Sequence, residues 1–181
     1  GGTVIQERKL AETLGISRTP MREALVRLEG EGWLARLTDR LLSVKVIDLT
    51  EFLHALSVRR LLECEAIRNA AIKLPDEEID RLSRMLTDLK ADPDPDNQVH
   101  WSFDDELHKA IAVSGGNPVL ARIVNDLRKT THLFEAQTVP QRLSPGIAEH
   151  EAILKALAAH DPELAVEAMQ MHLERVRAGV M

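Results

Sequence analysis

The sequence predicts a mainly α-helical protein, in which a small N-terminal helix-turn-helix with a β-hairpin precedes an all-α bundle of antiparallel helices. Three observations lead to this prediction. Aromatic residues make up only 3% of the chain and tyrosine is absent, a composition that favours helices over sheets. From residue 50 onward, apolar residues recur at helical spacing. Short strand-like segments occur only before residue 50. At 181 residues and 44% hydrophobic content, the chain can bury a sizeable core.

Two short helices are expected near the N-terminus. The first covers residues 6–14, and Gly15 follows it as a natural C-terminal stop. The second begins after Ser17 or Thr19, with Pro20 tolerated in its first turn because the missing N–H would be unpaired there. The apolar residues expected to pack from these two helices are Leu10, Ala11, Leu14, Met21, Ala24, Leu25 and Leu28.

Arg18 and Arg22 share a different face of the second helix. Two helices joined by so short a turn are typical of a helix-turn-helix, whose second helix enters the major groove of DNA. In that groove arginine pairs with guanine or binds phosphate. The alternative, on pattern alone, is an ordinary solvated helix surface that carries arginines.

A β-hairpin and a domain boundary follow. Residues 32–37 and 42–46 are predicted as short strands, with residues 38–40 as the turn of a hairpin wing. Asp48 then offers a cap, and Glu51 an acidic residue, for the first turn of a long helix. We therefore expect one domain at residues 1–48 and an all-helical domain at residues 49–181.

The all-helical domain is expected to contain six helices, at residues 50–73, 76–91, 97–114, 118–137, 144–159 and 162–178. Each break holds proline or glycine, residues that end helices: Pro75, the Asp-Pro-Asp-Pro-Asp run at 92–96, Gly-Gly-Asn-Pro at 115–118, Pro145 and Pro162. Such short connections predict mostly antiparallel neighbours.

The net charge of −6 is unevenly distributed along the chain. Residues 1–50 carry a net charge of +1 and the remainder carries −7. The acidity of the whole chain therefore does not exclude an N-terminal domain that binds nucleic acid. No apolar run approaches the roughly 20 residues of a membrane span, and no signal peptide is visible, so we expect a cytoplasmic protein.

Four residues are predicted to converge on one metal ion. Asp104 and His108 lie one helical turn apart, a spacing at which two side chains can hold one metal. The last two helices turn near Asp161, and His150 and His172 each lie 11 residues from it, so the hairpin brings them to the same height. Both occur in apolar stripes and are expected to point inward, where an unsatisfied polar group costs about 1–3 kcal/mol.

A metal ion would satisfy both imidazoles. For each of these residues taken singly, the alternative is a hydrogen-bonded core position. The other histidines, which lack this convergence, are expected at the surface: His54, His100, His132 and His160.

The N-terminal segment resembles a known family. The run Ser-Arg-Thr-Pro-Met-Arg-Glu-Ala-Leu at residues 17–25, with residues 6–12 and 28–32, is similar to the winged helix-turn-helix of GntR-family transcription regulators. The resemblance implies double-stranded DNA as a partner, with contacts from Arg8, Arg18, Thr19 and Arg22. The helix that normally precedes this motif in the family is missing here, and Thr-Asp-Arg-Leu-Leu at residues 38–42 replaces the usual glycine-containing wing tip.

The helical segment resembles the FCD effector-binding domain of the FadR-like GntR branch. The similar motifs are Val-Arg-x-x-Leu-Glu at residues 58–63, Asp-x-x-x-His at 104–108, Ser-Gly-Gly-Asn-Pro at 114–118, Glu-His-x-x-Ile-Leu-x-Ala at 149–156, and Ala-Met-x-x-His-Leu at 168–173. Metal-binding members have an Asp and three His at matching positions, which implies a metal held by Asp104, His108, His150 and His172. Such ligands suit Zn²⁺, Ni²⁺, Co²⁺ or Mn²⁺.

The resemblance also indicates residues that would bind an effector. Arg59 matches a family position that often faces the pocket, so we expect it to pair with an anion, with an ordinary salt bridge as the alternative. Arg128 and His132, one turn apart on the fourth helix of the bundle, are further effector-binding predictions.

Together these features predict a metabolite-responsive transcription regulator. We expect a homodimeric repressor that binds a pseudo-palindromic operator and responds to a small carboxylate effector. Two alternatives stay open. A metal with open positions could activate water in a hydrolase-like enzyme, although no glutamate or further histidine is expected beside the four ligands as a general base. The metal could also be purely structural, in a dimerisation module.

Overall fold

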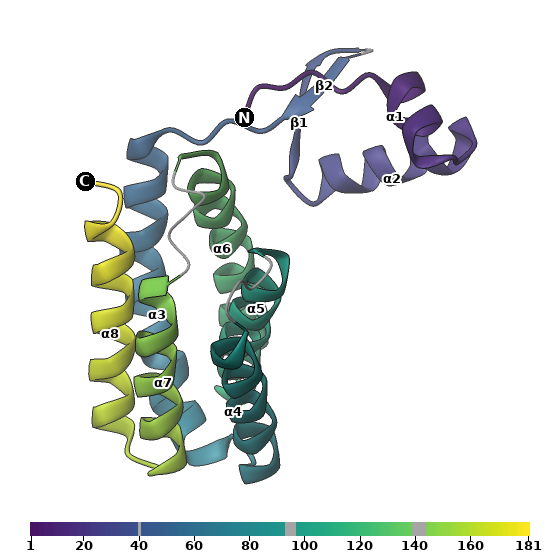
Figure 1. Ribbon diagram of the computed structural model, residues 1–181. Helices are drawn as coiled ribbons and strands as arrows, with labels where there is room; N and C mark the ends of the chain where they lie inside the picture. The colour runs from purple at the N-terminus through teal and green to yellow at the C-terminus, as the bar shows by residue number, and fades with distance from the viewer. Residues whose placement is uncertain (40, 93–96, 139–143) are drawn as a thin grey trace.

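Two short helices and a hairpin form an N-terminal unit, and six long helices form a bundle beside it (Figure 1). The structure is a computed structural model that describes residues 1–39, 41–92, 97–138 and 144–181. The N-terminal elements are α1 (Glu7–Leu14), α2 (Arg18–Gly30), β1 (Leu34–Thr38) and β2 (Leu41–Val44). The bundle consists of α3 (Leu49–Lys73), α4 (Asp76–Ala91), α5 (Asn97–Ser114), α6 (Pro118–Thr138), α7 (Ser144–Ala158) and α8 (Pro162–Ala178).

The predicted fold class is confirmed, and the bounds of the bundle helices agree with the predicted ones to within one residue. The reason is local chemistry at the helix ends. Asp48 caps α3 by accepting a hydrogen bond from the backbone N–H of Glu51 at 2.7 Å. Asp161 caps α8 in the same way, through the N–H groups of residues 163 and 164. Arg40 of the predicted hairpin turn and residues 93–96 of the predicted break at 92–96 lie outside the described residues.

The helix-turn-helix forms as predicted, but its packing face is narrower than expected. Gly15 ends α1 in the left-handed region, with φ of 66°. Ala11, Met21 and Leu25 are buried together with the first residue of β1. Leu14 and Leu28 were expected in this core, as was Ala24, but all three are exposed. Helices α1 and α2 are short, and each packs on one side only. The apolar residues at the edges of their packing faces therefore point outward.

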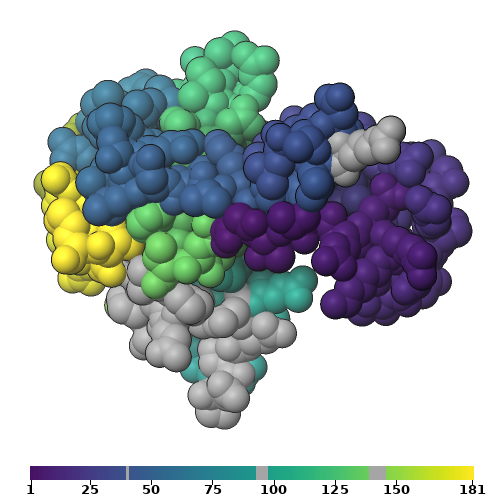
Figure 2. All heavy atoms as spheres, turned by 90° about the horizontal axis from the view of Figure 1, so that it is seen from above, coloured from purple at the N-terminus to yellow at the C-terminus, as the bar shows by residue number. Residues whose placement is uncertain are grey.

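A third extended segment, which the sequence analysis did not predict, joins the hairpin. Strands β1 and β2 pair antiparallel, with a register shift between Arg36 and Thr38. Residues 2–5 run along the other edge of β2, where Ile5 donates its N–H to the carbonyl of Leu42 at 2.8 Å. Figure 2 shows this N-terminal stretch, in purple, passing between the bundle and the rest of the N-terminal unit. The pairing covers an edge of β2 that would otherwise be open.

Helix α3 is the centre of the bundle. It packs against α5, α6, α7 and α8, while α4 packs against α5 and α7. Each of these helices contributes buried apolar side chains, and the largest of the fully buried ones include Phe52, Ile67, Leu82, Phe103, Leu107, Ile153, Leu157, Met169 and Leu173. None of the helices among the described residues is long and apolar enough to cross a membrane.

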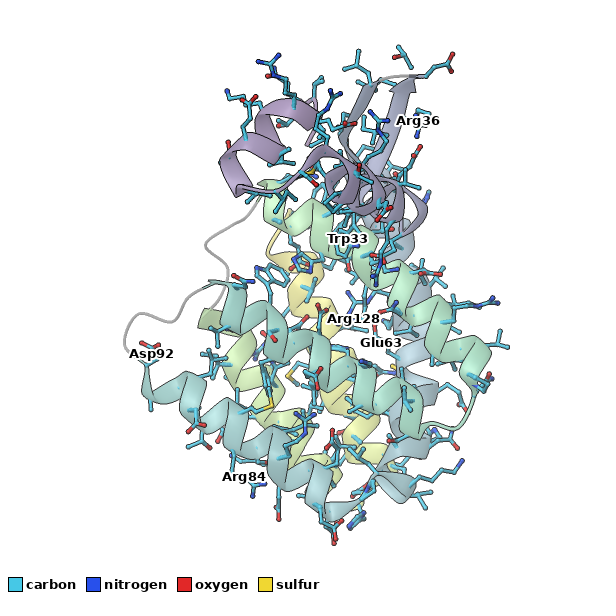
Figure 3. All side chains as sticks on the ribbon, turned by 90° about the vertical axis from the view of Figure 1, so that its right-hand side faces the viewer. Trp33, Arg36, Glu63, Arg84, Asp92 and Arg128 are labelled. Atoms are coloured by element: carbon cyan, nitrogen blue, oxygen red, sulfur yellow. The ribbon has the colours of Figure 1, made fainter. Side chains whose placement is uncertain are left out.

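The N-terminal unit contacts the bundle at the C-terminal end of α6. Trp33, just before β1, packs against the bundle core and lies 6.0 Å from His132 of α6, ring centre to ring centre. The side-chain amide of Gln137 donates a hydrogen bond to the carbonyl of Lys45 at 2.9 Å. Figure 3 shows Trp33 at this junction, with Glu63 and Arg128 inside the bundle below it.

Candidate metal centre

Helices α5, α7 and α8 bring the four predicted metal ligands together. Asp104 and His108 come from α5, His150 from α7 and His172 from α8, and one possible ligand atom from each lies within 4.8 Å of the others. The three imidazoles are buried, and the rings of His150 and His172 are 4.9 Å apart. The geometric argument that the α7–α8 hairpin aligns these two histidines therefore agrees with the structure.

Two buried glutamates hold two of the imidazoles from behind. The Nδ1 atom of His108 contacts Glu63 Oε2, and the Nδ1 atom of His172 lies 3.0 Å from Glu149 Oε2. A carboxylate accepts hydrogen bonds, so each Nδ1 carries the proton and each Nε2 keeps its lone pair. Histidines that bind metals are usually oriented by a carboxylate in this way.

These two glutamates were not predicted from the sequence, for which the expectation was only that no glutamate lies beside the four ligands as a general base. Glu63 is 45 residues from His108 along the chain, so no local pattern connects them. Glu149 directly precedes His150 yet contacts His172 on the neighbouring helix. Since both carboxylates accept hydrogen bonds from imidazoles, they orient ligands and are not placed as free general bases.

The remaining polar atoms of the cluster fit a metal ion. His108 Nε2 and both ring nitrogens of His150 are buried, and none has a hydrogen-bond partner among the described residues. His150 Nε2 lies 3.0 Å from Asp104 Oδ1, and His108 Nε2 lies 3.6 Å from the same oxygen, without the alignment of a hydrogen bond. Each such buried group costs about 1–3 kcal/mol if nothing satisfies it. Imidazole nitrogens and one carboxylate are the donors that divalent transition metals take.

Nearby charges set the protonation states that metal binding requires. Burial raises the pKa of Asp104, but the positive charge of Arg128 and the interactions with His108 and His150 together outweigh it and hold that pKa well below its usual range. Burial, and then Arg128, lowers the pKa of His108 to about 3. Burial also lowers the pKa of His172. At neutral pH the carboxylate is therefore ionised and these two imidazoles are neutral, as metal ligands must be.

The predicted effector residues line a small cavity beside the cluster, but the two arginines are already engaged. The cavity has a volume of about 50 Å³, room for a few water-sized groups. Arg59 donates to Glu63 at 2.6 Å and to the hydroxyl of Thr131 at 2.7 Å. Arg128 donates to Asp104 and Asp105, each at 2.7 Å. Both guanidinium groups thus hold carboxylates of the cluster or its surroundings in place.

The expectation of surface positions was wrong for His100 and only partly met for His132. His100 is 5% exposed and lines the cavity. His132 is half-buried and stacks on Trp101, with ring centres 4.0 Å apart. Both histidines lie next to bulky or charged groups of another helix, which the sequence of their own helix does not reveal. His54 and His160 are exposed, as expected.

The predicted DNA-contacting residues are exposed on the N-terminal unit. Arg18, Thr19 and Arg22 line one surface groove along α2. Arg22 donates to Glu7 of α1 at 3.1 Å, and Arg18 lies 3.8 Å from the same carboxylate. Arg8 is not among the residues that line this groove and pairs with Glu12 on α1 at 3.0 Å.

The fold and the cluster define a class of protein. A winged helix-turn-helix, which binds DNA in the proteins that contain it, is here joined to an all-α domain with a small cavity, an arrangement that indicates a transcription regulator. Comparison with known proteins supports this class. Residues 1–40 match the bacterial regulatory proteins of the gntR family, and residues 54–175 match the FCD domain. The chain belongs to the GntR family and carries a C-terminal FCD domain.

Named relatives are regulators too. An uncharacterized HTH-type transcriptional regulator of Bacillus subtilis strain 168, YcbG, is 30% identical, over 100% of this chain and 82% of its own. The gluconate operon transcriptional repressor of Bacillus licheniformis is 29% identical, over 99% of this chain and 76% of its own. The solved Zn²⁺-bound FCD domain of TM0439 has the same fold, with a TM-score of 0.64 and 20% identity, over 75% of this chain and 95% of that domain.

These findings distinguish a transcription regulator from a hydrolase-like enzyme. The chain is a transcription regulator with a DNA-binding N-terminal domain, and it is not an enzyme. The prediction of the family is confirmed. The hydrolase-like alternative is thereby set aside.

Proposed function

We propose that this protein is a metal-dependent sensor of a small organic acid that represses transcription. Residues 1–48 would read the operator, and residues 49–181 would bind metal and effector. The observation that carries the proposal is the buried cluster of Asp104, His108, His150 and His172, with ring nitrogens that lack hydrogen-bond partners among the described residues. Zn²⁺, Ni²⁺, Co²⁺ and Mn²⁺ are all compatible with these donors.

The proposed effector is a small carboxylate. A divalent metal with open coordination positions supplies a Lewis-acidic centre that binds a carboxylate oxygen. The cavity beside the cluster, with Trp101 and His132 in its wall, offers an adjoining space for the rest of the molecule. The name of the gluconate operon repressor, one of the relatives, is consistent with an organic-acid signal in this family.

A contact between aromatic rings offers a route from the cavity to the reader. Trp101 lines the cavity, His132 stacks on Trp101, and His132 also makes a T-shaped contact with Trp33 of the N-terminal unit. An effector that moves Trp101 would change the packing of His132 and so bias the orientation of the reader. Such an effect requires the effector to bind the DNA-bound and free arrangements with different affinity, typically by 1–3 kcal/mol.

We also propose that the protein is a homodimer in the cytoplasm. Val58, Leu61 and Ile72 are exposed along one stripe of α3, by 42%, 69% and 69%. Val58 and Leu127 line a groove between α3 and α6, and Ile123, one turn before Leu127, is also exposed. Exposed apolar side chains on two neighbouring helices favour association with a second copy. A two-fold dimer would bind a pseudo-palindromic operator, with Arg8, Arg18, Thr19 and Arg22 at the DNA.

The proposal is tested by selection and titration. The protein is loaded with Zn²⁺, its operator is selected from a random duplex library, and gel shifts then measure affinity with and without a panel of small carboxylates. We expect an enriched inverted repeat and a change of about 5- to 150-fold in affinity with one acid. If no sequence is enriched at moderate salt, the reader function is refuted. If the metal raises stability but no acid binds, the metal is structural and the sensor function is refuted.

A further inference from the structure

His100 carries a buried nitrogen for which the metal cluster provides no partner. It lies on α5, one helical turn before Asp104, and is 5% exposed. Its Nδ1 atom is buried and has no hydrogen-bond partner among the described residues. Because leaving such a group unsatisfied is unfavourable, an unpaired buried nitrogen of this kind needs an explanation.

The nitrogen is close to the metal cluster without belonging to it. The four ligand atoms that converge come from Asp104, His108, His150 and His172, and His100 does not contribute a fifth. Its ring centre is nevertheless 6.3 Å from that of His150, and it lines the same cavity. His100 is therefore positioned to reach a molecule bound on the metal, and not the metal itself.

Gly146 keeps the space between the two imidazoles open. A Cβ atom at this position of α7 would lie 3.5 Å from His100 Nε2 and 3.6 Å from His150 Cε1. These are ordinary contact distances, so a side chain would fit but would occupy the space in front of both rings. Glycine is less favourable than alanine in a helix, and here it leaves the wall of the cavity bare.

Four other polar side chains of the cavity are already engaged. Arg59 and Arg128 donate to carboxylates, and the hydroxyl of Thr131 donates to a backbone carbonyl. Glu135 interacts with another group as well. Outside the metal ligands and their carboxylates, His100 is the side chain of the wall with a buried polar atom that has no hydrogen-bond partner among the described residues.

We infer that His100 is the residue that recognises the effector: one carboxylate oxygen of the acid binds the metal, and the imidazole of His100 donates a hydrogen bond to the other oxygen. The inference rests on the proposed sensor function and adds a specificity residue to it. If the inference is correct, His100 strengthens the binding of carboxylates but not of anions that bind the metal and have no second acceptor atom. Acetate has a second oxygen that can accept this hydrogen bond, whereas chloride has no second atom.

The test uses the full chain loaded with Co²⁺, whose visible absorption responds to a change of ligand. Titration with sodium acetate and with sodium chloride gives two affinities for the native protein and for each variant. His100→Phe is expected to weaken acetate binding about tenfold, the loss of one hydrogen bond to a charged group, with chloride binding unchanged. His100→Gln, whose amide can donate, should recover part of the acetate affinity. Gly146→Ala should weaken acetate more than chloride. His54→Phe, at an exposed position, is the matched control.

Each outcome decides. If His100→Phe and His100→Gln both bind acetate as the native protein does, the role of His100 is refuted while the sensor function stands. If either variant loses Co²⁺ in elemental analysis, His100 serves the metal site or the fold, and the inference is again overturned. If the native Co²⁺ protein responds to neither acetate nor a panel of larger carboxylates, the sensor function fails and the inference fails with it.

Discussion

Replacement of Glu63 by Gln tests the structure of the metal centre most directly. Glu63 is 1% exposed and accepts hydrogen bonds from Arg59 and from Nδ1 of His108. The amide is nearly isosteric, but it has only one acceptor atom for two donors. Because Arg59 is always protonated, the amide oxygen is expected to turn toward it. The amide N–H₂ then faces His108 and favours the tautomer with the proton on Nε2, the atom that should bind metal.

Two magnitudes follow from this geometry. Loss of the carboxylate that orients a metal-binding histidine typically lowers metal affinity by about 10- to 100-fold, or about 1.4–2.8 kcal/mol. The buried ion pair with Arg59 is also broken, and removal of one partner of such a pair costs about 3–5 kcal/mol of folding stability. The retained hydrogen bond from Arg59 to the amide places the Glu63→Gln variant toward the lower end of that range.

The assay is Zn²⁺ competition with a chromophoric chelator, together with urea unfolding of the metal-free protein. Glu106→Gln is the matched control, since Glu106 lies on α5 but pairs with Arg81 in a partly exposed ion pair. An ion pair this accessible to solvent contributes about 1 kcal/mol or less, and metal affinity should not change in this control. If Glu63→Gln binds Zn²⁺ as tightly as the native protein, the argument that Glu63 orients His108 is wrong.

Four further predictions follow from the same structure. His108→Ala should abolish stoichiometric metal in elemental analysis while His54→Ala retains it, and stoichiometric metal in both would contradict the ligand cluster. Arg22→Ala should weaken operator binding by about 1–3 kcal/mol and reduce its salt dependence; Arg84→Ala, exposed at the far end of the bundle (Figure 3), should have no effect in the same gel shifts. The metal-free protein should lose stability as pH falls below about 6.5, because the unfolded histidines bind protons that folded His108, with its pKa of about 3, does not. The free energy of unfolding, measured with urea at a series of pH values, should fall by up to about 1.4 kcal/mol per pH unit for each imidazole kept neutral in the folded protein. A free energy of unfolding that stays constant from pH 7 to 5 would refute this prediction. His132→Leu should preserve metal binding but reduce the effect of the effector on operator affinity, so an unchanged effect in the gel shift would exclude the aromatic route.

Much of the fold could be predicted from the sequence because its signals are local. Helix bounds in the bundle follow from Asp48, Asp161 and the proline and glycine breaks, all of which act within one turn of the residues they affect. The metal ligands were also accessible, since Asp104 and His108 share one helix face. His150 and His172 flank one hairpin symmetrically. The pairing of residues 2–5 with β2 was not accessible, because an isolated extended segment has no periodic pattern to mark its partner.

The helices, the strands and the four metal ligands could be identified from the sequence alone. The way in which these ligands are held depends on the tertiary structure. These contacts join side chains from different helices, which burial of the apolar core around α3 brings together. They are the contact of Glu63 with His108, the hydrogen bond from Arg128 to Asp104, and the place of His100 in the cavity wall. Burial of apolar surface is nondirectional and acts on whole helix faces. The sequence therefore indicates which faces pack together, but not which polar atoms on neighbouring helices come into contact.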